Sequence, residues 1–332
     1  MNVAVFGAGV IGGYLAAKLA EAGVAVVAIA RGAQLAAIRA HGLRLLEGGA
    51  PRSVAVEATE DARSLGPQDL VIVTLKAHSL PAAAADIAAL CSPETTIVAA
   101  QNGIPWWYFH REGGPLEGTR IAAVDPKGTL YETLDPARVL GCVVQMAATQ
   151  PEPGLVRHQA GNRFMLGEPR GGSSERLERV VAVLDKAGLE GVATSAIRYE
   201  IWHKLWGNVA FNPLSVVTQA TMDRLIGDPG TRAVATAVMS EAERVANRLG
   251  IRFDMSAEAR IDGLKRLGAY KTSALQDVEA GRPIELGALA EAVAELAERL
   301  GIETPMLKSL ATLARMRAET ALLRRQSADR PR

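Results

Sequence analysis

The chain of 332 residues contains few cysteines, few aromatic residues and almost no excess of one charge. Its two cysteines, Cys91 and Cys142, lie far apart without a CxxC pair or a His/Cys cluster, so neither a disulfide framework nor a zinc site is indicated. The formal net charge is +1 and both signs are spread along the chain, which excludes a global basic field for nucleic acid. Binding partners must therefore be sought in local motifs.

Long hydrophobic runs are also missing. Hydrophobic residues make up 48% of the chain, but charges interrupt every stretch before it reaches the ~18 residues of a membrane span. The first residues, MNVAVFGAG, begin a strand at once and lack the charged and long apolar regions of a signal peptide. We therefore expect a cytoplasmic protein with no membrane and no nucleic-acid partner.

Short apolar segments alternate with helical patterns through the first half of the chain. Several segments are apolar at consecutive positions, which is typical of strands buried on both faces of a parallel sheet. The predicted strands are residues 3–6, 25–30, 54–56, 70–75 and 96–100. The predicted crossover helices include residues 11–22, 79–90 and 104–110. This alternation predicts an α/β fold with a doubly wound Rossmann sheet.

The pattern changes after residue 140. Residues 141–167 form closely spaced runs broken by proline and glycine, which predict antiparallel strands added to the sheet edge, followed by a helix at 175–187 and a strand near Val192. Beyond residue 198 helical spacing dominates, in residues 201–217, 229–249, 257–278 and 286–300. We predict a Rossmann-type domain at 1–197 and an all-helical substrate and dimerisation domain at 198–332, with a frayed tail at 324–332.

A glycine motif directly follows the first predicted strand and opens a helix. It reads Gly7-Ala8-Gly9-Val10-Ile11-Gly12. In this context Gly7 permits a tight turn, Gly9 lets the backbone approach a pyrophosphate, and Gly12 allows the helix to pack closely on the strand. The helix N-terminus offers free N–H groups and a positive dipole end to phosphates. The motif therefore predicts a dinucleotide site.

The end of the second predicted strand lacks the carboxylate that NAD enzymes usually offer to the ribose 2′-hydroxyl. It reads Ile29-Ala30-Arg31-Gly32 instead. A guanidinium suits a 2′-phosphate, because it forms charge-assisted and potentially bidentate hydrogen bonds. We therefore predict NADP(H) as the cofactor. The alternative for Arg31 is a solvated surface arginine.

One predicted helix carries a lysine and two amides on a single face. Lys204, Asn208 and Asn212 follow one another at a spacing of four, which places their side chains in line. The rest of the helix is rich in Leu, Val, Phe and Trp, so this polar line is hard to explain as core. A solvated helix face is the alternative to a catalytic site.

Taken in order, these segments resemble the ketopantoate reductase (2-dehydropantoate 2-reductase) family over nearly the whole chain. The motifs that carry the resemblance are GAGVIGG at 7–13, Arg31, Val73-Thr74-Leu75-Lys76, Gln101-Asn102-Gly103, Lys204-Leu205-Trp206-Gly207-Asn208 with Asn212-Pro213-Leu214, and Ser273-Ala274-Leu275-Gln276-Asp277 with Gly281-Arg282-Pro283-Ile284-Glu285. Each motif is weak alone, but this order and spacing are not expected by chance in an unrelated dehydrogenase.

The resemblance implies NADPH-dependent reduction of a 2-oxo acid to a 2-hydroxy acid, with 2-dehydropantoate as the expected substrate. It implies that Lys204 is the general acid and that Glu285 is a catalytic carboxylate near the lysine and the cofactor. The implied cofactor-binding residues are Gly7, Ala8, Gly9, Val10, Ile11, Gly12, Arg31, Lys76, Asn102, Ala148 and Glu285. The implied substrate-binding residues are Asn102, Lys204, Asn208, Asn212 and Ser273. For Glu285 the alternative is an exposed glutamate at a helix start.

Three stretches depart from the family pattern. The family often has a further substrate-contacting asparagine in the segment that here reads Thr221-Met222-Asp223, which contains none. After Glu285 the family often has a hydrophobic residue, an aspartate and then Asn-Gly, whereas this chain reads Leu286-Gly287-Ala288-Leu289-Ala290-Glu291. Residues 102–141 are also about twenty residues longer than in compact relatives, well beyond ordinary loop lengths. This insertion contains Trp106-Trp107-Tyr108-Phe109, which line a pocket, form a subunit interface, or make a local core.

Three functions are compatible with the sequence: a ketopantoate reductase, a relative that acts on another 2-oxo or hydroxy acid, and a non-enzymatic NADP(H) sensor. In a sensor without catalytic activity we would expect the polar residues of the site to be lost, yet the lysine, amides, serine and glutamate of the site are all present in this chain. Neither His203 nor His158 is a strong acid/base candidate, because the first points about 100° away from Lys204 around the helix and the second lies in a predicted edge strand. We expect a homodimer that acts on a small molecule.

Overall fold

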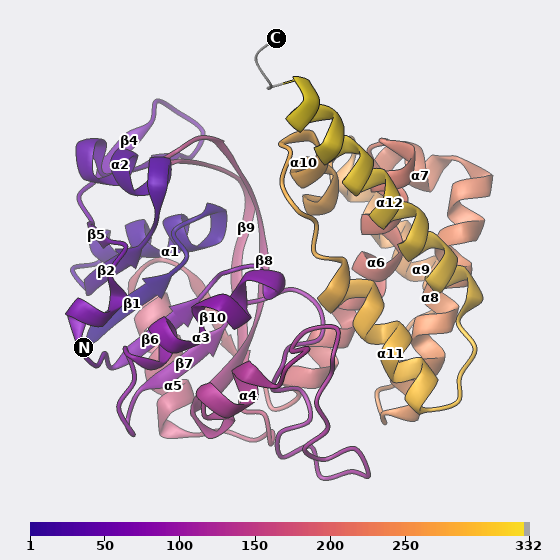
Figure 1. Ribbon diagram of the computed structural model, residues 1–332, viewed down its shortest axis with the longest axis horizontal. Helices are drawn as coiled ribbons and strands as arrows, with labels where there is room; N and C mark the ends of the chain where they lie inside the picture. Colours follow the sequence, from indigo (N-terminus) through magenta and orange to yellow (C-terminus); the bar gives the residue numbers. More distant parts are fainter. Residues whose placement is uncertain (329–332) are drawn as a thin grey trace. The chain divides into compact units, whose positions relative to one another are not determined.

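The computed structural model describes residues 1–328, which form two compact units (Figure 1). The first unit comprises Met1–Arg120 and Lys127–Glu200, and the second comprises Ile121–Pro126 and the chain from Ile201 onward. A short segment of the insertion, Ile121–Pro126, therefore belongs to the second unit although both of its flanks belong to the first.

A mixed sheet forms the centre of the first unit. Its strands are β1 (Asn2–Phe6), β2 (Ala25–Ile29), β3 (Leu43–Leu46), β4 (Arg52–Val54), β5 (Glu57–Thr59), β6 (Leu70–Val73), β7 (Thr96–Ala99), β8 (Val139–Glu152), β9 (Leu155–Gly167) and β10 (Glu190–Ala193). Within the described chain their order is β4-β3-β9-β8-β7-β6-β1-β2-β5, and β10 pairs with β9. The long β8–β9 hairpin is antiparallel, as is the β3–β4 pair, whereas β1 pairs in parallel with both β2 and β6.

The consecutive apolar residues of the central strands explain this arrangement. Every residue of β6 and β7 is buried, and β1 is buried from Val3 to Phe6, because helices cover both faces of a parallel sheet. The helices of this unit are α1 (Val10–Glu21), α2 (Gly32–His41), α3 (Leu80–Ala88), α4 (Thr129–Thr133) and α5 (Glu175–Lys186), of which the short α4 packs on α3. The predicted α/β fold class, a Rossmann sheet with antiparallel edge strands, is confirmed.

The described residues of the second unit form helices joined by turns and loops, without a strand. Its helices are α6 (Ile197–Thr218), which starts in the first unit, α7 (Met222–Gly227), α8 (Pro229–Arg248), α9 (Ala257–Leu264), α10 (Ser273–Glu279), α11 (Ala292–Arg299) and α12 (Pro305–Ala328). Figure 1 shows α12 running across this unit, where it packs on α8 and α10. No helix among the described residues is both long and apolar enough to cross a lipid bilayer.

The helix α6 is the core element of the second unit. Trp202 and Trp206 are fully buried, and the indole Nε1 of Trp206 donates to the carbonyl of Met239 on α8 at 2.9 Å. The same indole stacks on Phe253 with ring centroids 4.1 Å apart. This packing leaves the opposite side of α6 to the polar line that begins at Lys204.

Several predicted boundaries are wrong. Residues 104–110 form turns rather than a helix, because their apolar residues are buried by tertiary packing and not along one helix face. The predicted helix 257–278 is interrupted at Gly268, whose φ of 58° ends the helical path. The predicted strand 54–56 shares only Val54 with a strand, β4, and residues 55 and 56 connect β4 to β5. The tail prediction is wrong up to Ala328, where α12 ends, and residues 329–332 lie outside the described residues.

Candidate functional site

The glycine motif forms the turn between β1 and α1. Gly7 has a φ of 104°, and a Cβ there would lie 2.8 Å from Leu75 Cδ2, so both conformation and space require glycine. A Cβ at Gly12 would overlap the carbonyl oxygen of Gly7 and the hydroxyl of Thr74. At Gly9, by contrast, no heavy atom lies within 4 Å of the Cβ position. Gly7 therefore permits the turn, Gly12 permits the tight contact between helix and strand, and Gly9 leaves the backbone open to an approaching group.

The carboxyl ends of three neighbouring strands are tied together at this edge. Thr74, directly after β6, donates through its Oγ1 to the carbonyl of Gly7 at 2.7 Å. Gln101, after β7, donates through its Nε2 to the carbonyl of Val73 at 2.6 Å. Because these strands run parallel, the half-buried Lys76 and Asn102 follow the same edge as the glycine motif.

The start of α2 is held to the glycine motif by a residue that sequence reasoning missed. Gln34 donates through its Nε2 to the carbonyl of Ala8, and its Oε1 accepts from Gln150 Nε2 at 2.7 Å and from the amide of Gly154 at 2.8 Å. The exposed Arg31 stands immediately before α2. Gln34 thus fixes the helix start beside Arg31, the glycine turn and the hairpin tip. The sequence gives no sign of this role, because two of the three partners of Gln34 are backbone atoms, which every residue type provides.

Ala148 lies in β8, where it pairs with His158 of β9. The ring of His158 stacks on Tyr14 of α1 at a centroid distance of 5.1 Å, and its Nε2 lies 2.6 Å from the carbonyl of Gly161. His158 therefore has a structural role, as expected. Ala148 packs against the core that contains Tyr14 and Leu15, so the hairpin strand runs alongside the helix that begins at the glycine motif.

The predicted polar line on α6 lies in the second unit. Lys204 and Asn208 are half-buried, and Asn212 is only 4% exposed. Burial and the nearby Arg260 guanidinium lower the pKa of His203, so this imidazole is neutral at pH 7.

A short chain of hydrogen bonds joins α6 to the start of α10. Ser215 donates through its hydroxyl to the carbonyl of Asn212 at 2.7 Å, and the hydroxyls of Ser215 and Thr272 are 2.5 Å apart. Thr272 also caps α10, because its Oγ1 accepts from the amide of Leu275 at 3.2 Å. The exposed Ser273, first residue of α10, is thereby set beside the turn that carries Asn212.

Glu285 ends the loop that leaves α10. Arg282 in this loop donates through its Nε to the buried carboxylate of Asp277 at 3.1 Å, and its amide bonds the Asp277 carbonyl at 2.8 Å. The loop turns at Gly281, where φ is 68°. Glu285 is half-buried and directly precedes the helical residues that start at Leu286. It is therefore not the exposed glutamate of the alternative interpretation.

The predicted site residues divide between the two units. The glycine motif, Arg31, Lys76, Asn102 and Ala148 belong to the first unit. Lys204, Asn208, Asn212, Ser273 and Glu285 belong to the second. The first set offers glycine backbone and cationic side chains, which suit a phosphorylated cofactor, and the second offers an ammonium, amides and a hydroxyl, which suit a small polar acid.

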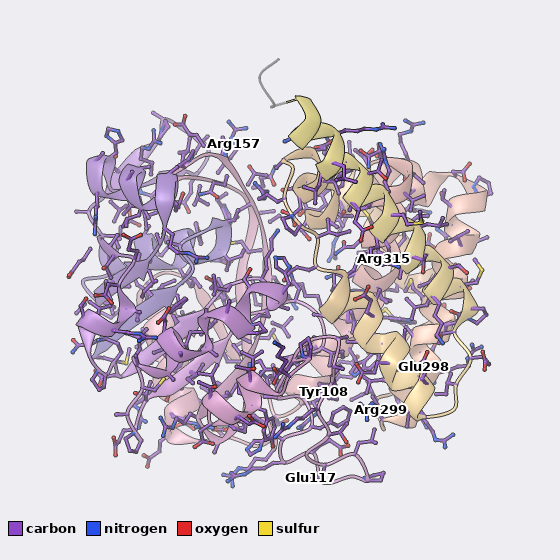
Figure 2. The ribbon with its side chains drawn as sticks, in the orientation of Figure 1. Tyr108, Glu117, Arg157, Glu298, Arg299 and Arg315 are labelled. Carbon is purple, nitrogen blue, oxygen red and sulfur yellow. The ribbon has the colours of Figure 1, made fainter. Side chains whose placement is uncertain are left out.

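The aromatic run of the insertion is a local core. Trp106, Trp107, Tyr108 and Phe109 are each at most 5% exposed. Arg198 closes this core, because it donates to the carbonyls of Tyr108 and His110 at 2.8 Å each and lies over the ring of Tyr108, which Figure 2 labels. These aromatics are therefore unavailable to line an interface.

Two family profiles match this chain, and both describe the same family. Residues 3–171 match the profile described as ketopantoate reductase PanE/ApbA, and residues 196–318 match the profile for its C-terminal part. The chain is 49% identical to a 2-dehydropantoate 2-reductase of Mesorhizobium japonicum, covering 95% of this chain and 97% of the relative.

Solved structures agree with this result. A candidate ketopantoate reductase of Ralstonia solanacearum MolK2 is 46% identical, with a TM-score of 0.92 over 96% of this chain and 98% of that one. A D-mandelate dehydrogenase solved with NADH and anilino(oxo)acetate shares the fold, with a TM-score of 0.84 at 20% identity over 97% of this chain and 99% of that one.

The glycine geometry predicts opposite stabilities for two similar substitutions. Gly12→Ala places a methyl group against backbone and the Thr74 hydroxyl, so we expect unfolding free energy to fall by about 1–3 kcal/mol or more. Gly9→Ala meets open space, so the loss should stay within about 1 kcal/mol. Urea denaturation measures both. Equal stability of the two variants would show that α1 does not pack on the strand ends as described.

Proposed function

Because the chain belongs to the ketopantoate reductase PanE/ApbA family, we propose that it reduces 2-dehydropantoate to pantoate with NADPH in the cytoplasm. The main support is the polar line of Lys204, Asn208 and Asn212 on a helix whose other residues from Leu205 to Val216 are all buried. The chain is also 49% identical to a 2-dehydropantoate 2-reductase. The retained lysine, amides and glutamate argue against a non-enzymatic sensor.

The residues of the first unit fit a nicotinamide dinucleotide. The open space at Gly9 is one that a Cβ would fill, and it lies at the N-terminus of α1. The first backbone bond of this helix runs from the amide of Gly13 to the carbonyl of Gly9 at 2.8 Å. The amides of Val10, Ile11 and Gly12 therefore have no acceptor within the helix and suit a phosphate. Arg31 would pair with the 2′-phosphate of a bound NADPH, and Lys76 and Asn102 would hold the cofactor at the same sheet edge.

NADPH, when bound, supplies the hydride that forms the new C–H bond at the ketone carbon. Lys204 polarises the carbonyl and gives its proton to the oxygen as negative charge develops there, and it then regains a proton from solvent. Glu285 holds the ammonium in position and bonds a substrate or ribose hydroxyl. Asn208, Asn212 and Ser273 bind the carboxylate and the distal hydroxyl of the acid without a competing charge.

Replacement of the lysine is the direct test of this mechanism. Lys204→Ala should lower turnover by ~10² to 10⁴, the usual loss for a positioned general acid. NADPH affinity should remain nearly unchanged, because the phosphates are held by the first unit. The assay follows NADPH oxidation over a panel of 2-oxo acids that includes 2-dehydropantoate.

His203→Gln is the matched control, because this neighbouring imidazole is neutral and points away from the polar line. Its turnover should stay within about threefold of wild type, well short of the loss of a general acid. If Lys204→Ala also stayed within that range on the best substrate, the general-acid assignment would be wrong. If another 2-oxo acid were reduced much faster than 2-dehydropantoate, the mechanism would stand and the substrate would change.

The cofactor preference depends on Arg31. NADPH should bind at least tenfold more tightly than NADH, because a charge-assisted pair with the 2′-phosphate contributes about 1.5–3 kcal/mol. Arg31→Ala should remove most of this difference while leaving NADH affinity within about twofold of wild type. Fluorescence titration of both nucleotides measures it. Equal affinity in the wild-type protein would contradict the assignment of NADP(H).

We also propose that the protein is a homodimer that uses α12. Three large apolar side chains of this helix are 54–63% exposed: Leu313, Met316 and Leu323. They lie within about 100° of the helix circumference, next to Arg315, which Figure 2 labels. An exposed apolar stripe of this kind is typical of an interface between protein chains.

Light scattering tests the dimer. The wild-type protein should have twice the mass of one chain at micromolar concentration, and the double change Leu313→Asp with Met316→Asp should shift it to a monomer with retained α-helical content. Met255→Asp is the control, because this exposed side chain lies outside α12. A wild-type monomer, or a variant that stays dimeric, would exclude this surface.

A further inference from the structure

The segment Ile121–Pro126, called the strap here, is a compact turn of the second unit. The amides of Val124 and Asp125 donate to the carbonyl of Ile121 at 3.1 and 2.9 Å. Ile121 and Val124 are only 1% and 5% exposed. The strap is therefore a folded part of the helical unit, although the chain on both sides of it belongs to the first unit.

A glutamate of α11 holds the strap by its backbone. The two carboxylate oxygens of Glu295 accept from the consecutive amides of Ala122 and Ala123 at 3.0 and 2.9 Å. Arg299, labelled in Figure 2, donates to the same carboxylate at 2.8 Å from one turn further along α11. Hydrogen bonds with an ionised acceptor are the stronger kind, so this contact fixes both the position and the orientation of the turn.

The strap also meets the helix start that follows Glu285. A Cβ on Gly287 would lie 2.8 Å from the carbonyl oxygen of Ala123, closer than real Cβ atoms approach another atom. The φ of Gly287 is not positive, so space and not backbone conformation requires glycine here. Gly287 opens a π-helical turn, Gly287–Glu291, in which its carbonyl accepts from the amide of Ala292. The strap carbonyl occupies the place of a side chain two residues after Glu285.

We propose that the strap positions Glu285 for catalysis, with Glu295 and Gly287 as the positioning residues. Glu295 fixes the turn, the Ala123 carbonyl lies against Gly287, and this contact sets where the helix begins and hence where the preceding Glu285 stands. A displacement of about 1 Å at a reacting group costs up to 10²-fold in rate, so small errors at this helix start affect turnover. The proposal rests on the catalytic role of Glu285 in the proposed function.

Two substitutions disturb the strap by different routes. Gly287→Ala introduces a Cβ against the Ala123 carbonyl, and Glu295→Gln replaces one acceptor oxygen with an NH₂ group that faces a backbone amide. Each should lower kcat by tenfold or more while the Kd for NADPH stays within twofold of wild type. Gly263→Ala and Glu298→Gln are the matched controls, because no heavy atom lies within 4 Å of a Cβ at Gly263 and Glu298 bonds Lys308 instead of the strap. Both controls should keep wild-type kcat.

A double-mutant cycle separates positioning from general stabilisation. If the strap acts through Glu285, Gly287→Ala should have little further effect on the residual turnover of Glu285→Ala. Hydrogen exchange at the amides of Ala122 and Ala123 gives a readout without activity, and it should speed up in Glu295→Gln and remain slow in Glu298→Gln.

The possible results separate this proposal from the proposed function. If the wild-type protein turns over a 2-oxo acid and both Gly287→Ala and Glu295→Gln keep its kcat, the role of the strap is overturned. The reductase assignment then remains intact. Fully additive losses in the double mutant would likewise reduce the strap to a stabilising element. A wild-type protein with no turnover on any 2-oxo acid would overturn both.

Discussion

The contact of α1 with the ends of β1 and β6 is the constraint on which the nucleotide-binding edge depends. Gly12 has no side chain, so the helix begins close enough for the Thr74 hydroxyl to bond the Gly7 carbonyl. That bond ties the strand that precedes Lys76 to the glycine turn, and Gln101 ties the next strand to the same edge. A single tight helix–strand contact thereby arranges side chains from three separate strands.

In the second unit one helix, α6, carries the polar line on one side and packs into the hydrophobic core on the other. Trp202 and Trp206 fill the buried side of α6, and the Asn212 side is joined to α10 through Ser215 and Thr272. The Ser215 hydroxyl bonds the Asn212 carbonyl within α6 and the Thr272 hydroxyl at the start of α10, so two uncharged side chains join these helices. The helical unit is therefore both a scaffold and the source of the polar groups.

The sequence predicted the parts of the structure that depend on local requirements. Gly7, Gly9 and Gly12 each meet a local demand of turn, space or packing, and the family resemblance that the motifs indicate is confirmed. Gln34 was missed because two of its three partners are backbone atoms, which leave no mark on residue choice. Residues 104–110 were predicted as a helix because burial in a local core produces an apolar run that resembles a buried helix segment.

The insertion shows why a departure from a family pattern is informative only after the fold is known. In the sequence the long segment 102–141 and the glycine at position 287 are unrelated differences, separated by more than a hundred residues. In the structure they meet, because the Ala123 carbonyl lies where a side chain at 287 would project. A side chain at position 287 would clash with this carbonyl, so the position of the strap explains why the residue there is a glycine.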